Sequence, residues 1–409
     1  METLLDRFCR YVKVETTSVE DAKEYPSSAG QLELGRMLAE ELRALGLRDV
    51  GHHEGGIVMG TIPGNVDGAP TIAWLAHQDT SPETTAKDVK PNVIRNYDGR
   101  DIVLPGARSK VIRVEEFPQL KGLKGKTLIT SDGTTLLGAD DKAGIAVIMT
   151  AAEQLMRNPQ LRHGPIRVVF TCDEEVGRGT DKVDLKKIDA LVAYTLDGED
   201  EAGIENETFS ADMATVTFTG FNIHPGFGYG KMINAIRMAG EFLAKLPRDK
   251  APETTRGRDG FLHPYVLNGG VDSARIQILL RSFVTAELAQ QAEILEGIAR
   301  EVRASFPGGK VAIEIKKQYR NMIEHLAREP RAVKLAEQAI RNVGLTPKFQ
   351  SIRGGTDGSR LSEAGLPTPN LSCGMHNFHS PLEFACLEQM ENAVRVLVEL
   401  AQLWGREKA

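Results

Sequence analysis

TTLLGADDKAGIAVIMTAAEQLM, residues 134–156, joins a short apolar run to a longer one and places two adjacent aspartates at the junction. The pattern predicts a short strand, a hinge at Gly138 and an apolar helix from about Asp141 to Met156. Two adjacent like charges repel each other, although aspartate is also common at helix N-termini. The role of Asp140 and Asp141 therefore depends on which residues gather around them.

Strand and helix patterns alternate in the first half of the chain. Apolar runs predict buried strands in TIAWLAHQDT (71–80), PIRVVFTCDEEVG (165–177) and DALVAYTLDGE (189–199). A helix is predicted in SSAGQLELGRMLAEELRALG (27–46), with Ser27 or Ser28 as its cap and Gly46 at its end. This alternation predicts an α/β fold with a mixed, mainly parallel sheet covered by helices on both faces.

The pattern changes after Glu207. Strands are predicted in residues 211–221, 273–283 and 310–319, and helices in residues 228–246 and 285–306. These elements predict a small α+β domain at residues 208–321, inserted into a larger domain formed by residues 1–207 and 322–409. The larger domain resumes with helices in residues 329–344 and 390–405. Residues 81–126, rich in charge and turn residues, have no clear periodicity.

Composition argues against several classes of partner. The 409 residues carry a formal charge of −6, and no basic cluster favours nucleic acid or an acidic membrane surface. The N-terminus lacks the continuous apolar core of a signal peptide, and no run approaches the roughly 20 apolar residues of a membrane span. Four scattered cysteines contain no C-x-x-C pair. We therefore expect a cytoplasmic protein with no nucleic-acid or membrane partner.

Metal-capable side chains follow the predicted strands. They are His77, Asp79, Asp140, Glu174, Glu175 and Asp197, with His379 as a further candidate near the end of the chain. Ligands of open α/β sheets bind beyond the carboxyl ends of the strands, so these side chains are expected at one edge. Imidazoles and carboxylates without a thiolate suit two divalent ions, zinc first, with manganese or cobalt also possible.

Each of these residues also has an ordinary explanation. A histidine near a strand end is usually a core or surface residue, DEE after a strand is usually a solvated turn, and paired aspartates often cap a helix. These explanations weaken when all the acids fall at the same edge of the sheet. Asp79, two residues after His77, can also reach its second ring nitrogen. In the DEE turn, one glutamate can bind metal while its neighbour accepts a proton from water.

Six segments together resemble the peptidase T family of aminotripeptidases. They are LAHQDTSP, TTLLGADDKAGIAVIMTA, TCDEEVGRG, YTLDG, IRGGTDGSRLSEAGLPTPNL and HNFHSPLEF, and the likeness runs in the same order from about residue 3 to residue 400. That family belongs to a dinuclear-zinc superfamily that also contains carboxypeptidases, dipeptidases and N-acyl amino-acid deacylases. The resemblance implies a catalytic domain that binds two zinc ions and a ferredoxin-like inserted domain that acts as a lid and carries a homodimer contact.

The resemblance also implies a role for each acid and histidine. Asp140 would bridge the two ions and be joined to Asp141 by a cis peptide bond. The other ligands would be His77 and Asp197 on one ion and Glu175 and His379 on the other. Glu174 would be the general base that activates a metal-bridging water, and Asp79 would orient His77.

Substrate contacts are implied for the inserted domain and the segment after it. His224 resembles the lid histidine that stabilises the oxyanion, often from the partner subunit. Asn234 and Arg281 match lid positions that hold the substrate, and Arg353 matches an arginine that receives the C-terminal carboxylate of the peptide. A guanidinium group suits this last role because it binds a carboxylate through two hydrogen bonds.

Three departures from the family pattern border the substrate. Ser282 replaces the usual acid after Arg281, SPLEF (380–384) replaces GKHEF, and IHPGFGYGKMINAI (223–236) replaces a lid segment that often reads VHPGTAKGKMVNA. The expected activity is removal of the first residue from a tripeptide. The alternatives are a dipeptidase, a carboxypeptidase, an N-acyl amino-acid deacylase, or a scaffold protein without catalysis.

Overall fold

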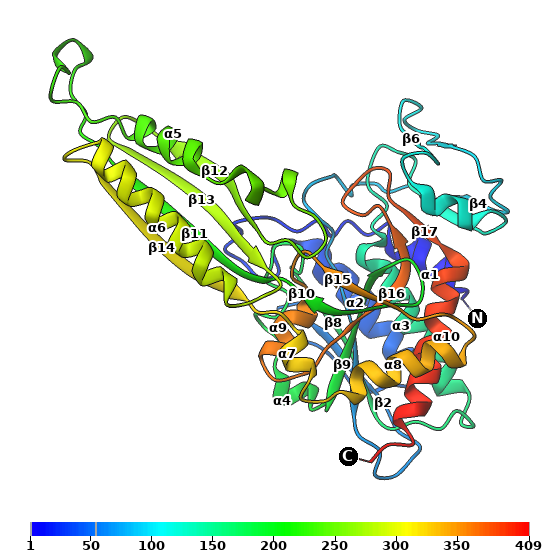
Figure 1. Cartoon of the computed structure of the whole chain (residues 1–409). Helices are drawn as coiled ribbons and strands as arrows, with labels where there is room; N and C mark the ends of the chain where they lie inside the picture. The colour runs from blue at the N-terminus through cyan, green and yellow to red at the C-terminus, as the bar shows by residue number, and fades with distance from the viewer. Residues whose placement is uncertain (1, 54, 409) are drawn as a thin grey trace. The chain divides into compact units, whose positions relative to one another are not determined.

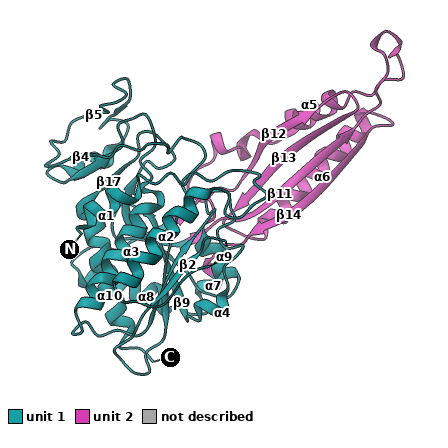
Figure 2. Ribbon diagram, turned by 180° about the vertical axis from the view of Figure 1, so that it is seen from behind, with its two compact units in different colours: residues 1–206, 324–350, 356–409 teal, residues 207–323, 351–355 magenta. Residues whose placement is uncertain are grey.

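The structure, a computed structural model, describes residues 2–53 and 55–408. The chain forms two compact units, coloured separately in Figure 2. Unit 1 comprises residues 1–206, 324–350 and 356–409, and unit 2 comprises residues 207–323 and 351–355. The short segment 351–355 belongs to unit 2, although the sequence assigned it to the larger domain. The roles of the two units as catalytic domain and lid stay predictions.

Unit 1 contains an 11-stranded mixed sheet (Figure 1). Nine strands lie in the order β1-β2-β8-β3-β9-β16-β17-β7-β4, and β10 pairs with both β16 and β15. The strands are β1 (Arg48–His52), β2 (Val58–Ile62), β3 (Ile72–His77), β4 (Asn92–Ile94), β7 (Leu128–Thr130), β8 (Ile166–Thr171), β9 (Val192–Glu199), β10 (Gly203–Thr208), β15 (Lys348–Ile352), β16 (Asn370–His376) and β17 (Phe384–Cys386). The pairs β8–β3, β3–β9 and β9–β16 are parallel, whereas the flanking pairs are antiparallel. The predicted mixed sheet is confirmed, and its four central strands β8, β3, β9 and β16 are parallel.

Helices cover both faces of this sheet. They are α1 (Leu4–Tyr11), α2 (Ala29–Ala44), α3 (Ala139–Arg157), α4 (Leu185–Ile188), α7 (Ile323–Leu326), α8 (Arg331–Asn342), α9 (Asp357–Glu363) and α10 (Leu387–Trp404). Successive residues of a strand point to opposite faces. Trp74 and Ala76 of β3 therefore pack in the core with α1, α2, α3, α8 and α10, whereas Ala73 and Leu75 pack with α4 and α9.

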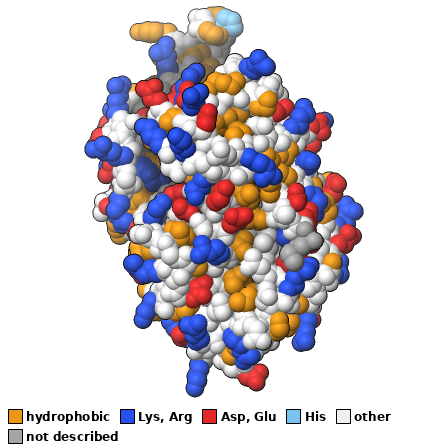
Figure 3. Space-filling view, turned by 90° about the vertical axis from the view of Figure 1, so that its right-hand side faces the viewer, with side chains coloured by type: hydrophobic (Ala, Val, Ile, Leu, Met, Phe, Trp, Pro, Cys, Tyr) orange, Lys and Arg blue, Asp and Glu red, His pale blue; other side chains and the backbone are white. Residues whose placement is uncertain are grey.

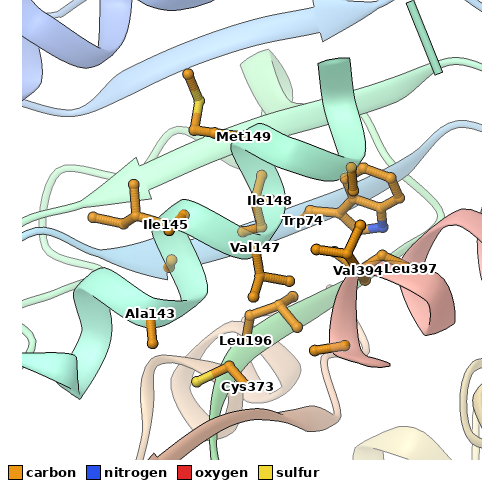
Figure 4. Close-up of a cluster of buried hydrophobic side chains, with 14 of the residues drawn as sticks. Trp74, Ala143, Ile145, Val147, Ile148, Met149, Leu196, Cys373, Val394 and Leu397 are labelled. Carbon is orange, nitrogen blue, oxygen red and sulfur yellow. The ribbon is translucent and has the colours of Figure 1, made fainter. Parts of the chain in front are cut away.

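Helix α3 is the centre of the larger core. Its Ile145, Val147 and Ile148 are fully buried, and Figure 4 shows them among side chains of β3, β9, β16 and α10. Because this helix is apolar on most sides, it is enclosed by neighbouring elements rather than exposed along one face. Burying it fixes the position of the two aspartates at its N-terminal end.

The start of α3 differs from the sequence prediction. Residues 134–138 do not form a strand; the strand is β7, and residues 131–138 form an irregular turn. Polar side chains there bond to the nearby backbone, as when Ser131 Oγ donates to Thr135 O at 2.7 Å. Such local bonds compete with strand pairing. The predicted helix is confirmed, and the bond between Asp140 and Asp141 is cis, as the resemblance implied.

Helix α2 agrees with its predicted range. Leu34, Leu38 and Leu42 face the core, at the spacing of one helical face. Ser28 stands at the N-cap, although its side chain makes no capping hydrogen bond. Gly46, with φ of +88°, ends the helix and donates to Arg43 O at 3.0 Å.

Residues 81–126, which showed no periodicity, form a satellite layer with a small core. They contain β4, the two-stranded sheet of β5 (Ile102–Val103) and β6 (Val111–Ile112), and the 3₁₀ helix η1 (Pro118–Leu123). Tyr97, Leu104 and Leu120 are buried there against Phe384 of β17. Elements of two or three residues are too short to produce a recognisable sequence period.

Unit 2 has the ferredoxin-like arrangement. Its strands are β11 (Ser210–Thr219), β12 (Phe261–Gly269), β13 (Ser273–Ser282) and β14 (Lys310–Tyr319), and its main helices are α5 (Ala235–Lys245) and α6 (Glu287–Ser305). The chain order is βαββαβ and the strand order is β12-β13-β11-β14, antiparallel throughout. The sequence prediction missed β12, which contains Pro264 and lies at the edge, where proline is tolerated.

The two ends of unit 2 are fastened to each other. The backbone N–H of Thr208 donates to Asn321 Oδ1 at 3.1 Å, and the N–H of Asn321 donates to Ser210 Oγ at 2.9 Å. The N–H of Met322 also donates to the Thr208 hydroxyl at 3.2 Å. The chain therefore enters and leaves the 207–323 segment of this unit at neighbouring points.

None of the described helices combines the length and apolar character needed to cross a bilayer. The face of the molecule seen in Figure 3 carries basic and acidic side chains interspersed with polar and apolar ones. On that face no large region of one charge is visible, which agrees with the lack of a basic cluster in the sequence.

Candidate metal centre

The predicted metal-capable residues of unit 1 gather at the carboxyl ends of the parallel strands. His77 is the last residue of β3, Asp197 lies near the end of β9, and Glu174 and Glu175 follow β8. His379 lies in the loop after β16, and Asp140 is at the start of α3. Parallel strands present their carboxyl ends at one edge, so five separate chain segments meet here.

Asp140 lies between the two histidines. Its Oδ1 is 2.9 Å from His77 Nε2, and its Oδ2 is 3.2 Å from His379 Nε2. Each imidazole nitrogen also faces a second carboxylate: His77 Nε2 is 3.7 Å from Asp197 Oδ1, and His379 Nε2 is 2.9 Å from Glu175 Oε2. The result is two clusters, each of one imidazole and one carboxylate, that share Asp140.

The charges of this cluster do not balance. Burial, followed by the negative charge of Asp140, raises the pKa of Glu175 to about 8 and that of Asp197 to about 7. Burial opposes protonation of the His379 ring, but Asp140 and Glu175 outweigh it and raise its pKa to about 11. Buried carboxylates outnumber the imidazoles, so additional positive charge would stabilise the site.

A pair of divalent ions fits these residues. Glu175 Oε1 is buried and has no hydrogen-bond partner, an unusual state for a carboxylate oxygen. Oxygen and imidazole donors from several segments converge, among them two sets of three with donor atoms within 4.8 Å of one another: His77, Asp141 and Asp197, and His77, Asp140 and Glu175. This donor set, without thiolates, is suited to zinc, manganese or cobalt.

Asp141 also lies close to the cluster, but its oxygens are already used. Its Oδ2 accepts the backbone N–H of His77, and its Oδ1 accepts the N–H of Gly144, both at 3.1 Å. Asp141 therefore holds the end of β3 against the start of α3. The sequence showed the adjacent pair but contained no signal for this division of roles.

Asp79 contacts both His77 and the DEE turn. Its Oδ1 is 3.4 Å from His77 Nδ1, which is also 3.1 Å from the Asp79 carbonyl oxygen. The same carboxylate accepts the N–H groups of Glu174 at 3.0 Å and Glu175 at 3.1 Å. The approach to His77 was predicted from the spacing, whereas the two bonds to the DEE turn were not.

Glu174 lines a small cavity at the metal centre. The cavity is bounded by Leu75, Ala76, His77, Asp141, Glu174, Thr195, Asp197 and Asp357. Burial and the nearby negative charge of Asp357 raise the pKa of Glu174 well above its ordinary value. A carboxylate with an elevated pKa is a stronger proton acceptor, the property that a general base needs.

Three further residues position the site and were missed by the sequence interpretation. Asn370 Oδ1 accepts the Asp197 N–H at 2.9 Å, and Asp173 accepts the N–H of Ser27 at 2.8 Å, tying the DEE turn to the start of α2. Glu383 accepts three backbone N–H groups of the segment that leads to Asp140. Only Asp173 had a signal, as the first acid of DEE.

The four other predicted residues belong to unit 2. His224 is exposed, and its Nδ1 accepts the Gly226 N–H at 3.2 Å. Asn234 caps α5 by accepting the Ile236 N–H at 2.9 Å.

Arg281 and Arg353, two of these four residues, already donate hydrogen bonds to backbone carbonyl oxygens. Arg281 is 8% exposed and donates to the carbonyl oxygens of Asp212 and Leu280. Arg353 donates to the carbonyl oxygens of Gly257 and Asp259, both at 2.8 Å, and stacks over Phe209 and Phe261. A substrate carboxylate would have to compete with these bonds.

Comparison with known proteins gives consistent similarities. A model of peptidase family M20/M25/M40 matches residues 132–403. Peptidase T of Brevibacillus brevis is 46% identical over 402 residues, covering 98% of each chain. The crystal structure of aminopeptidase PepT from Bacillus cereus is similar with a TM-score of 0.76 and 23% identity, covering 98% of both chains. A tripeptidase from Staphylococcus aureus has a TM-score of 0.78 and 22% identity, covering 99% of this chain and 98% of that one. At these identities the two structures establish the fold.

Proposed function

We propose that this chain, which belongs to peptidase family M20/M25/M40, is a metal-dependent aminopeptidase that removes the N-terminal residue from tripeptides. The full-length relative named Peptidase T supports this activity over the dipeptidase, carboxypeptidase and deacylase alternatives. The observation that carries the proposal is the position of Asp140, which turns one carboxylate oxygen toward each of two imidazoles.

The proposed ligands divide into two sets. Asp140 would bridge the ions, and the remaining ligands would be His77 and Asp197 for one and Glu175 and His379 for the other. Zinc is the proposed metal, with manganese or cobalt as alternatives. When bound, such ions would make a water acidic near neutral pH and polarise the scissile carbonyl.

The residues of the chain perform the proton transfers. Glu174 accepts a proton from the attacking water and then delivers it to the amine of the leaving dipeptide. Asp79 keeps Glu174 in place through its backbone and keeps the His77 ring oriented. We propose that His224 stabilises the oxyanion and that Asn234, Arg281 and Arg353 hold the peptide.

Two properties of the intact protein are also proposed. The chain forms a homodimer through unit 2, where Phe221, Phe227 and Tyr229 are exposed within one segment. It works in the cytoplasm, in keeping with its four unpaired cysteines. Light scattering after size-exclusion chromatography would test the dimer.

Hydrolysis of an unblocked tripeptide tests the proposed activity. The metal-loaded protein is compared on this tripeptide, its N-acetylated form and the corresponding dipeptide, and the products are identified by mass spectrometry. Release of the first residue from the free tripeptide alone supports the proposal. Faster cleavage of the dipeptide or of the acetylated peptide would instead favour the dipeptidase or deacylase activity, with the same metal centre.

A further inference from the structure

The loop that carries His379 is fixed at both ends. It connects β16 to β17, which pair antiparallel with Met375 opposite Ala385 and His376 opposite Phe384. The His376 ring stacks on Phe384 with centroids 4.6 Å apart and planes inclined by 15°. The loop therefore leaves and rejoins the sheet at one anchored point.

Glu383, the last residue of this loop, binds the backbone that precedes α3. It is 1% exposed. Its Oε2 accepts the N–H groups of Leu137 and Gly138, both at 2.7 Å, and its Oε1 accepts the N–H of Asp140 at 3.0 Å. Three backbone N–H groups held by one buried carboxyl group leave this segment little freedom.

This contact joins two segments that each carry a proposed ligand. Asp140 lies within the bound segment, and His379 lies four positions before Glu383 in the loop. The two side chains meet at 3.2 Å, between Asp140 Oδ2 and His379 Nε2. Segments so far apart in sequence need a tertiary contact to hold this spacing, and Glu383 supplies one directly.

We propose that Glu383 is a positioning residue of the metal centre, which sets the spacing of Asp140 and His379 by fastening their two segments together. The inference rests on the proposed function, because metal binding by Asp140 and His379 gives this contact its role. Glu383 touches neither substrate nor reacting atoms. It acts through the backbone of a ligand, and loss of such a supporting contact typically lowers metal affinity by about 10–100-fold.

Two variants and a matched control test the role. Glu383→Gln keeps the size but replaces one acceptor oxygen with an NH₂ group, which only donates hydrogen bonds. Glu383→Asp keeps the charge but shortens the side chain by one methylene. The control is Glu153→Gln on α3, because Glu153 is also buried, at 5% exposed, and bonded to Arg7 and Arg157 away from the proposed ligands.

The measurement is metal binding rather than turnover. Metal-depleted proteins are titrated with Zn²⁺ against a chromophoric chelator, the Co²⁺ forms are compared by visible absorption, and unfolding of the metal-free proteins is followed by circular dichroism. We expect Glu383→Gln to bind at least one ion about 10–100-fold more weakly, with an altered Co²⁺ spectrum. Glu153→Gln should lose stability while binding both ions with wild-type affinity.

Wild-type affinity and spectrum in Glu383→Gln would overturn the inference. If that variant does not fold, Glu383→Asp decides: weaker metal binding supports the role, and unchanged binding refutes it. Failure of the wild-type protein to bind two ions would instead refute the proposed function. Different results would therefore refute the role of Glu383 and the proposed function.

Discussion

Glu174 and Glu175 are neighbours in sequence but are placed for different tasks. The Glu175 carboxylate meets His379 at 2.9 Å, whereas Glu174 lines the cavity beside His77 and Asp197. Both backbone N–H groups are held by Asp79, so the turn presents the two side chains from one rigid support. This arrangement supports the proposed division of roles, with Glu175 as a metal ligand and Glu174 as the base.

Replacing Glu174, the proposed base, should separate metal binding from catalysis. In Glu174→Gln we expect turnover to fall by about 10²–10⁴-fold, because general-base catalysis is lost, while two ions remain bound. In the matched variant Glu175→Gln, metal content should fall as well. Peptide hydrolysis and metal analysis of both proteins check this prediction, and near-normal turnover in Glu174→Gln would show that another group is the base.

At the scale of elements, α3 lies unusually close to β9. A Cβ atom on Gly144 would lie 2.0 Å from Leu196 O and 2.3 Å from Asp141 Oδ1. The glycine is thus required by the close approach of two elements that carry proposed site residues. Any side chain there must move the helix, the strand or the aspartate.

Gly144→Ala should therefore destabilise unit 1, by about 1–3 kcal/mol as is usual for overpacked positions, and weaken metal binding. The control is Gly240→Ala in α5, where the new methyl group would have no described atom within 4 Å apart from its chain neighbours and the backbone of its own helix. That change should stabilise its helix by about 0.4–1 kcal/mol. Urea unfolding and metal titration measure both effects, and wild-type metal affinity in Gly144→Ala would contradict the packing argument.

Helix α1 is attached to α2 by a charged network. Glu41 accepts from Arg7 Nε at 2.6 Å, and from Arg10 Nη2 and the Tyr11 hydroxyl at 2.7 Å each. Burial alone would raise the pKa of Glu41, but the bonds from Arg10, Arg7 and Tyr11 outweigh it and hold the pKa below the ordinary 4.5. The ionised form is therefore favoured in the folded protein.

A lowered carboxyl pKa stabilises the fold only where the group is ionised. The contribution of Glu41 should be complete above about pH 4.5 and should decline as the pH falls through the lower folded value. Glu41→Gln should reduce the free energy of unfolding by about 1–3 kcal/mol at pH 7, with a smaller difference near pH 3. Urea unfolding at several pH values checks this, and a difference that grows on acidification would contradict the assignment.

At the scale of the whole molecule, each unit has its own core, and the proposed metal centre lies in only one of them. The proposed ligands all belong to unit 1, which also contains both tryptophans of the chain, Trp74 and Trp404. Both rings are buried, so their fluorescence reports the unfolding of unit 1 alone.

Removing metal should lower the unfolding temperature reported by tryptophan. An ion present at a hundred times its dissociation constant stabilises the folded state by about 2.7 kcal/mol, and the repelling carboxylates lose this support on chelation. Hydrogen exchange in β11 and β13 should change little on chelation, because unit 2 supplies no proposed metal ligand. Its proposed residues contact only the substrate. A chelator that leaves the tryptophan transition unchanged would count against a metal centre in unit 1.

The parts of the structure that sequence predicted are those with local signals. The strands that carry His77 and Asp197 at or near their ends, helix α3, and the strands and main helices of unit 2 other than β12 follow from periodicity. The bonds of Glu383 to the Asp140 segment depend on chain segments about 240 residues apart, which no local pattern encodes. No local pattern predicts that segment 351–355 belongs to unit 2 either. It packs there through the N–H of Phe209, which donates to Ile352 O.

The bonds that join Thr208 and Ser210 to Asn321 hold together the two ends of the continuous segment 207–323, which forms most of unit 2. A segment whose ends lie close together can be removed, or inserted into another protein, without leaving a wide gap in the host chain. Closing the cut chain with a few glycines would cost little loop entropy. Recombination at this point would therefore exchange residues 207–323 as one continuous segment of the host chain.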